Sequence, residues 1–170
     1  ASTILNISSL GMLAVCLLIF FFATPLTKLI APGFSIEQIH ATADITRIMM
    51  LSPIIFTISN VFSSVLISMK KFIIVNTAPL LYNLGIILGI VYLYPRYGIE
   101  GLAYGVIFGA LMHVGIQIPE AYRHGFRWRP VFKLADPGVR KIGALFLPRI
   151  VGLDSSYVNL IVVSIIGSTL

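Results

Sequence analysis

Long uncharged stretches, separated by short polar segments, dominate the pattern of this chain. No Asp, Glu, Lys or Arg occurs from Ala1 to Thr27, between Arg47 and Lys70, between Lys71 and Arg96, or between Glu100 and Glu120. Each stretch is mostly apolar and has about 20 residues or more, enough for an α-helix to cross roughly 30 Å of hydrocarbon. A fifth apolar stretch begins near Arg149. The pattern therefore predicts an all-α polytopic membrane protein with about five transmembrane helices.

Proline and glycine set the expected limits of these helices, because proline interrupts helical hydrogen bonding. Pro25 and Ala31-Pro32-Gly33 predict the end of the first helix, Tyr94-Pro95 that of the third, and Pro119 that of the fourth. Asp136-Pro137 is typical of a helix start and predicts a short amphipathic helix at the membrane interface. The expected spans are 3–30, 47–69, 73–94, 100–119 and 149–170, with the interfacial helix at 137–147.

Basic residues are distributed unequally between the two expected sides of the membrane. One side holds only Lys28, Arg47 and Arg96, whereas the other holds Lys70, Lys71, Arg123, Arg127, Arg129, Lys133, Arg140 and Lys141. Cytoplasmic loops carry the excess of Lys and Arg. We therefore expect the loops around Lys70–Lys71 and Arg123–Lys141 to be cytoplasmic, so that the first span runs outwards.

Composition excludes the main alternatives to a membrane protein. The chain is 58% hydrophobic and 11% charged, with a mean hydropathy of +0.99, whereas soluble chains are about 25% charged. The same values exclude a disordered chain. A net charge of +6 is also typical of nucleic-acid-binding proteins, but the basic residues lie between apolar stretches, where the bilayer explains them. We therefore expect a lipid bilayer, and no nucleic acid, as a partner.

The two ends of the sequence predict a fragment of a longer protein. The chain begins with Ala1 rather than Met and ends within the apolar stretch Val158–Leu170. We expect flanking helices of the same protein to be its missing partners. Cys16 is the single cysteine, so no intrachain disulfide is expected.

Glycines recur at helical spacing in two of the expected spans. Gly101, Gly105 and Gly109 follow one another every four residues, and Gly85 and Gly89 repeat that spacing. Such a stripe lets another helix approach closely. We interpret these glycines as helix-packing positions, with a sliding surface in a moving bundle as the alternative.

Three prolines are candidates for helix bends. Pro53 and Pro79 lie a few residues inside the second and third spans, and Pro148 separates the interfacial helix from the last span. A proline within a helix leaves a carbonyl without its donor and bends the helix. Gating is the functional alternative, although membrane helices generally tolerate proline.

Polar residues within spans are the candidates for lining a cavity, because burying them in lipid is costly. The candidates are Asp154, Asn159, Asn83, His113 and Gln117. For Asn83 and His113 the alternative is a hydrogen bond to a neighbouring helix, and for His113 a proton relay is a further one. Asp154 requires a partner, water or a proton, since Arg149 lies five residues away on another helix face.

The sequence contains no recognisable catalytic or metal-binding group. It has no carboxylate pair at helical spacing, no Ser–His or Cys–His cluster and no phosphate-binding glycine loop. His40, His113 and His124 fall in an outer loop, a span and a cytoplasmic loop, so a shared metal site is not expected. We therefore predict a protein that is not an enzyme and has no cofactor.

Short motifs follow one another along almost the whole chain in the order of a known family. They are Ala31-Pro32-Gly33-Phe34, Arg47-Ile48-Met49 with Pro53, Lys71-Phe72 with Ala78-Pro79 and Asn83, Gly101-Leu102-Ala103-Tyr104-Gly105, Gln117-Ile118-Pro119, and Leu147-Pro148-Arg149 with Asn159. In this order the chain resembles the lipid II flippase family (MurJ, or MviN) of the multidrug/oligosaccharidyl-lipid/polysaccharide exporter superfamily.

The resemblance implies that residues 1–170 correspond to spans three to seven of about fourteen. It implies most of the N-terminal lobe of a two-lobed transporter in the bacterial inner membrane. Such a transporter would move an undecaprenyl-diphosphate-linked sugar–peptide from the inner to the outer leaflet by alternating access. The family's cavity arginines fall on spans outside this chain.

Four other functions remain open from the residues. A flippase for another polyprenyl-linked glycan, or a drug exporter, would share the same superfamily. An integral-membrane lipid transferase would need a polar catalytic cluster at one interface, which this sequence does not show. A membrane-assembly subunit would need a packed interior without a polar lining.

Overall fold

The computed structural model describes residues 2–132, 139, 141, 144 and 163–167. Its helices are α1 (Ser2–Ile30), α2 (Ile36–Met49), α3 (Leu51–Ser68), α4 (Phe72–Leu88), the π-helical turn η1 (Gly89–Leu93), α5 (Tyr94–Tyr97) and α6 (Ile99–Arg123). Over the described residues it contains no strand.

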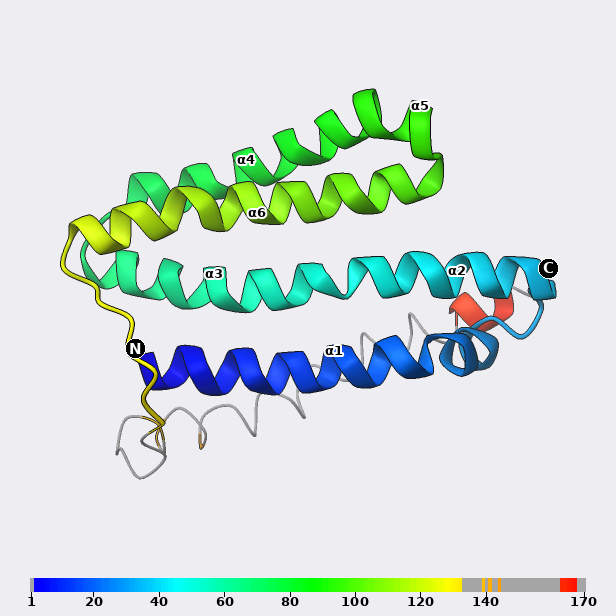
Figure 1. The fold of residues 1–170 in the computed structure, drawn as a ribbon, viewed down its shortest axis with the longest axis horizontal. Coiled ribbons are helices and arrows are strands. Elements are labelled where there is room, and N and C mark those ends of the chain that lie inside the picture. The colour runs from blue at the N-terminus through cyan, green and yellow to red at the C-terminus, as the bar shows by residue number, and fades with distance from the viewer. Residues whose placement is uncertain (1, 133–138, 140, 142–143, 145–162, 168–170) are drawn as a thin grey trace.

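The helices form a row of long antiparallel rods (Figure 1). The first rod, α1, contacts α2 and α3; α3 contacts α6; and α6 packs along α4. In the described part of the chain, four helical segments are long and apolar enough to cross a membrane: Ser2–Ile30, Ile36–Ser68, Phe72–Tyr97 and Ile99–Arg123. The protein is therefore an all-α polytopic membrane protein, as the charge spacing predicted.

Large apolar side chains on the outside of this row show that water is not its solvent. Ile73 is 80% exposed, Phe21 71% and Leu80 66%. A buried cluster lies instead where α1, α3, α6 and the following segment meet, and its residues are Leu5, Phe62, Val65, Leu66, Val114, Ala121 and Phe126. Leaving so much apolar surface outside is favourable when the surroundings are lipid or other helices.

The second helical segment begins earlier than predicted. It starts at Ile36 instead of residue 47, because Ser35 and Gln38 form a capping box. The Gln38 N–H donates to Ser35 Oγ at 3.3 Å, and the Ser35 N–H donates to Gln38 Oε1 at 2.8 Å. Arg47 therefore lies within helix rather than at its beginning.

The third and fourth helical segments end later than predicted. Tyr94-Pro95 does not end the third: η1 comes directly before it, and α5 continues to Tyr97. Pro95 cannot donate to the carbonyl four residues earlier, within η1, and π-turns are a recurrent way of accommodating such a defect. Gly98, with φ +59°, then reverses the chain. Pro119 is likewise carried inside α6, which ends at Arg123.

The two described prolines that were expected to bend helices behave differently. Pro53 is the third residue of α3 and cannot donate to the Met49 carbonyl, and the helix is interrupted at Met50 between α2 and α3. Pro79 lies inside α4, which continues through it. The described residues do not include Pro148, most of the predicted interfacial helix or most of the predicted fifth span. The parts of these two segments that are described, Val139, Lys141, Ala144 and residues 163–167, are helical.

Candidate functional site

A ladder of polar side chains joins α3 to α6 inside the bundle. Ser59 Oγ lies 2.6 Å from His113 Nδ1, and Ser63 Oγ donates to Gln117 Oε1 at 2.9 Å. Gln117 Nε2 is 3.4 Å from His113 Nδ1, which links the two rungs. Ser59 and Gln117 are fully buried and His113 is 8% exposed. The ladder therefore gives these buried side chains hydrogen-bond partners within the bundle.

The Gln117 amide lies between Ser63 and the His113 ring. Its oxygen accepts from Ser63, so its NH₂ group faces His113 Nδ1, which accepts from it in the tautomer that carries the ring proton on Nε2. The Phe56 ring packs edge-on against the imidazole, with centroids 5.3 Å apart. His113 thus makes an interhelical hydrogen bond to Ser59 of α3.

The remaining candidates for a cavity lining are not part of this ladder. Asn83 is exposed on α4, and its side chain makes no hydrogen bond to another described residue. Asp154 and Asn159 lie outside the described residues. Neither His113 nor Gln117 lines the two large cavities of the described bundle.

The glycines of α4, η1 and α6 bring two backbones into contact. A Cβ added at Gly85 would collide with Gly109 Cα, and one added at Gly105 would lie 2.7 Å from Gly89 Cα. A Cβ at Gly101 would lie 2.5 Å from the Leu93 carbonyl. Every side chain larger than hydrogen at these positions would push the helices apart, as expected for small-residue packing in membranes.

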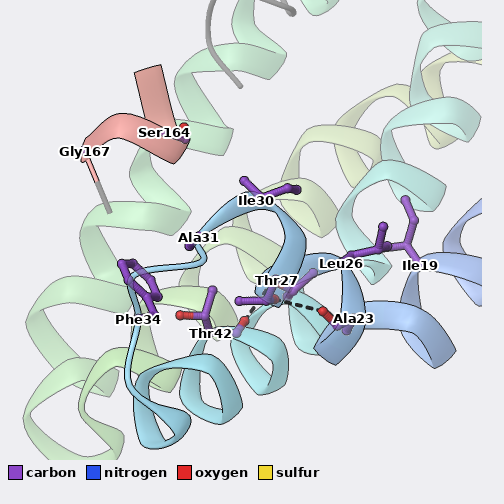
Figure 2. Close-up of a pocket in the computed structure, with 11 residues that line it drawn as sticks. Ile19, Ala23, Leu26, Thr27, Ile30, Ala31, Phe34, Thr42, Ser164 and Gly167 are labelled. Carbon is purple, nitrogen blue, oxygen red and sulfur yellow. Dashed lines mark hydrogen bonds between the residues drawn. The ribbon is translucent and has the colours of Figure 1, made fainter. Parts of the chain in front are cut away.

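A cavity of about 610 Å³ lies between α1, α2 and residues 163–167 (Figure 2). Two of its hydroxyl groups bond to their own helices: Thr27 Oγ1 donates to the Ala23 carbonyl, and Thr46 Oγ1 to the Thr42 carbonyl, each at 2.8 Å. The cavity therefore presents an almost apolar wall. It also places residues 163–167 beside Ile30 and Ala31, at the end of α1 opposite to Ser2.

A second, larger groove of about 830 Å³ lies between α1, the α2–α3 rod and α6. Its walls are apolar, and Asp44, Arg47 and Glu100 are its charged residues. Arg47 attaches α2 to α1, donating to Thr24 Oγ1 at 3.1 Å and to the Phe20 carbonyl at 3.3 Å. A third bond joins its guanidinium group to Asp44 Oδ1 at 2.6 Å.

A clasp joins the start of α1 to the segment that follows α6. Asn6 donates to the carbonyls of Arg129 and Val131, each at 3.1 Å, and accepts from Trp128 Nε1 at 2.8 Å. Ser2 Oγ donates to the Arg127 carbonyl at 3.4 Å and accepts from the Arg129 N–H at 3.3 Å. We call Ser2, Asn6, Trp128 and the backbone of residues 127–131 the clasp.

Comparison with known proteins assigns the bundle to a family. The family model described as "Lipid II flippase MurJ" matches residues 1–170. The chain belongs to this family. The motif order had predicted the same family, and that prediction is confirmed.

Individual MurJ relatives agree over long alignments. A protein of Borreliella burgdorferi named "Probable lipid II flippase MurJ" is 29% identical over 165 residues, which cover 97% of this chain and 32% of that protein. One of Buchnera aphidicola with the same name is 29% identical over 99% of this chain and 34% of its own length. One of Vibrio cholerae is 34% identical over 63% of this chain and 21% of that protein. The chain thus spans about a third of the length of the MurJ relatives that match it throughout.

Three features of this MurJ-family bundle were not predicted from its sequence. Asn6 and Trp128 were not selected, although a polar amide within an apolar helix and a tryptophan among arginines are signals of buried and interfacial contacts. Arg47 was assigned to the edge of a span, although Asp44 at i−3 on the same helix face indicated a partner.

Among the described residues, no three His, Cys, Asp or Glu side chains converge as metal ligands would.

Proposed function

We propose that this chain forms most of the N-terminal lobe of a lipid II flippase in a bacterial inner membrane. The match of the family model to residues 1–170 carries the proposal. In this function a polyprenyl-diphosphate-linked sugar–peptide crosses from the inner to the outer leaflet. No bond of the substrate is made or broken, so the protein is a transporter.

The physical task explains why such a protein needs two states. The head group of the substrate is anionic and hydrated, so carrying it through hydrocarbon requires a polar path, while its polyprenyl tail remains in lipid. Two lobes that rock about a central cavity expose the head group to one side at a time. The described helices supply long, mutually attached rods suited to one such lobe.

The positions of the described helix ends support the predicted orientation of the bundle in the membrane. The Lys70–Lys71 turn, the end of α6 and the start of α1 lie at one end of the bundle (Figure 1). Basic residues concentrate at that end, which we assign to the cytoplasm. Residues 163–167 lie beside Ile30 at the other end, where a fifth span running outwards from Arg149 would arrive.

Complementation tests this function. The complete gene encoding this chain is expressed in bacteria whose own flippase is depleted, and lipid II exposed at the outer leaflet is measured. We expect exposure of lipid II and growth to be restored. Normal expression in the membrane without any restored lipid II exposure would overturn the proposal.

We further propose that Asp154 and Asn159 line the cavity of this flippase. An ionisable side chain within an apolar span is costly unless water, a partner or a substrate meets it. Substituting Asp154→Asn should then lower lipid II exposure at unchanged protein abundance in the same cells. Full activity of this variant would remove Asp154 from the transport path.

A further inference from the structure

The segment after α6 is held to the bundle along its whole described length. The Phe126 N–H donates to the Ala121 carbonyl at 3.0 Å, and the Phe126 ring is buried against Phe62, with centroids 5.3 Å apart. The clasp then fixes residues 127–131 through Ser2 and Asn6, and Asn6 is itself 8% exposed. In Figure 1 this segment runs from the end of α6 past the N-terminus of α1. Its backbone is therefore ordered by contacts rather than by helical or strand structure.

Two arginines on this fixed backbone have no carboxylate partner among the described residues. Arg127 and Arg129 are exposed, and neither forms an ion pair with a described carboxylate. Arg123, at the same end of the bundle, differs because Glu120 lies 3.9 Å from its guanidinium. The segment thus presents two exposed guanidinium groups, two residues apart, on a backbone that the clasp holds in place.

The position of Trp128 places these arginines near the level of lipid head groups. Its indole N–H is bonded to Asn6, while 48% of the residue remains exposed. Tryptophan with one polar and one apolar contact is typical of the membrane–water interface. Arg127 and Arg129 flank it directly, at the end of the bundle that we assign to the cytoplasm.

We propose that Arg127 and Arg129 form a docking site for the diphosphate of a polyprenyl-diphosphate lipid at the inner leaflet. The inference rests on the proposed function, because it places the entry of the same substrate. Each guanidinium offers a planar fork of donors that matches one phosphate group, so two of them fit a diphosphate better than a single phosphodiester. The clasp orders the backbone in advance and so lowers the entropy lost on binding.

The positive-inside rule makes a different prediction for these arginines. If they only orient the protein, any basic residue at this end is equivalent, and the order of the backbone is irrelevant. If they form a docking site, the fork geometry and the clasp both matter. These two accounts are separated by comparing Arg→Gln, Arg→Lys and clasp variants.

Binding is measured on the purified protein by native mass spectrometry, with undecaprenyl diphosphate as the probe and phosphatidylglycerol as the competing lipid. The double variant Arg127→Gln with Arg129→Gln should weaken undecaprenyl diphosphate binding about ten- to a hundred-fold, as expected when charge-assisted hydrogen bonds are lost. The matched control Arg123→Gln should bind as the parent protein does. The double variant Arg127→Lys with Arg129→Lys should bind undecaprenyl diphosphate more weakly, while its binding of phosphatidylglycerol should stay unchanged.

The clasp is tested separately by Trp128→Phe, which keeps the ring and both arginines but removes the bond to Asn6. We expect several-fold weaker diphosphate binding by protein that is still expressed and folded, with a lower unfolding midpoint because the buried Asn6 Oδ1 loses its donor. The docking site would be refuted, in favour of general surface charge, by either of two results. One is a loss of diphosphate-lipid binding in the Arg123→Gln control equal to that in the Arg127→Gln, Arg129→Gln variant, and the other is a parallel loss of binding for both lipids.

Transport separates this inference from the proposed function. If the parent protein fails to restore lipid II exposure, the proposed function fails. If it restores exposure while the Gln double variant binds undecaprenyl diphosphate as the parent does, the docking site alone is refuted.

Discussion

The contact between α6 and η1 predicts opposite effects for the same substitution at two glycines of one helix. Gly105 and Gly115 both lie inside α6. A Cβ at Gly105 would be 2.7 Å from Gly89 Cα, against 3.4 Å or more in ordinary contact, whereas a Cβ at Gly115 would meet nothing within 4 Å. Gly105→Ala must therefore separate two backbones, and Gly115→Ala changes only the helix itself.

The magnitude follows from two competing terms. Alanine favours an exposed helix interior over glycine by about 1 kcal/mol, a gain common to both sites. Overpacking at a close contact costs about 1–3 kcal/mol, and here the obstructing atom is backbone, which cannot rotate away. Gly105→Ala should then be less stable than Gly115→Ala by about 1–3 kcal/mol, because the propensity term cancels in the difference.

Thermal or denaturant unfolding of the purified protein in detergent micelles measures this difference. Gly115→Ala should unfold at or slightly above the parent midpoint, and Gly105→Ala below it. Because the two variants share a helix and a substitution, expression level and detergent affect them alike. Equal midpoints for the two variants would refute the backbone contact between α6 and η1.

Three further substitutions, and one control at Asn83, test the polar contacts and the helix break. Gln117→Leu removes the acceptor of the Ser63 hydroxyl and one of the two contacts of His113 Nδ1, and it should cost about 1–3 kcal/mol of unfolding free energy. Asn83→Leu on the exposed face of α4 should change the unfolding free energy by less than about 0.5 kcal/mol, and similar losses for the two variants would refute the ladder. Arg47→Lys keeps the charge but cannot reach three acceptors at once, so the midpoint of unfolding should fall. An unchanged midpoint would contradict a stabilising role for the hydrogen bonds of Arg47. Pro53→Ala restores a backbone donor at the α2–α3 junction, and hydrogen exchange should show that the new amide is protected. Rapid exchange of this amide would show that the proline is not the cause of the helix interruption at Met50.

The sequence predicted the membrane helices because charge is excluded from lipid over a fixed length. It did not predict their true ends, since a helix can extend beyond hydrocarbon when caps such as Ser35 satisfy its first donors. The four-residue glycine spacing was visible in the sequence, but the pairing of the glycines depends on the register of the two antiparallel helical segments. Gly105 of α6 faces Gly89 of η1, and Gly109, four residues later, faces Gly85 of α4, four residues earlier.

The polar contacts were the least predictable part of the fold. Asn6 bonds to a residue 123 positions away and Ser59 to one 54 positions away. Helical periodicity describes only neighbours three or four residues apart, so it places such residues on a face without naming their partners. The candidate polar residues His113 and Gln117 were therefore identified by type, while their pairing with α3 required the structure.

The contacts together indicate which parts of this bundle move as one body. Arg47 attaches α1 to α2 near one end, the clasp attaches α1 to the segment after α6 near the other, and the ladder joins α3 to α6 between them. Separating any of these helices would leave bonded polar groups unpaired in lipid, which is costly. Backbone contact likewise couples α4 to α6. In the proposed transport cycle, rocking should therefore carry the described helices together, with local adjustment confined to the interruption at Met50 and the π-turn η1.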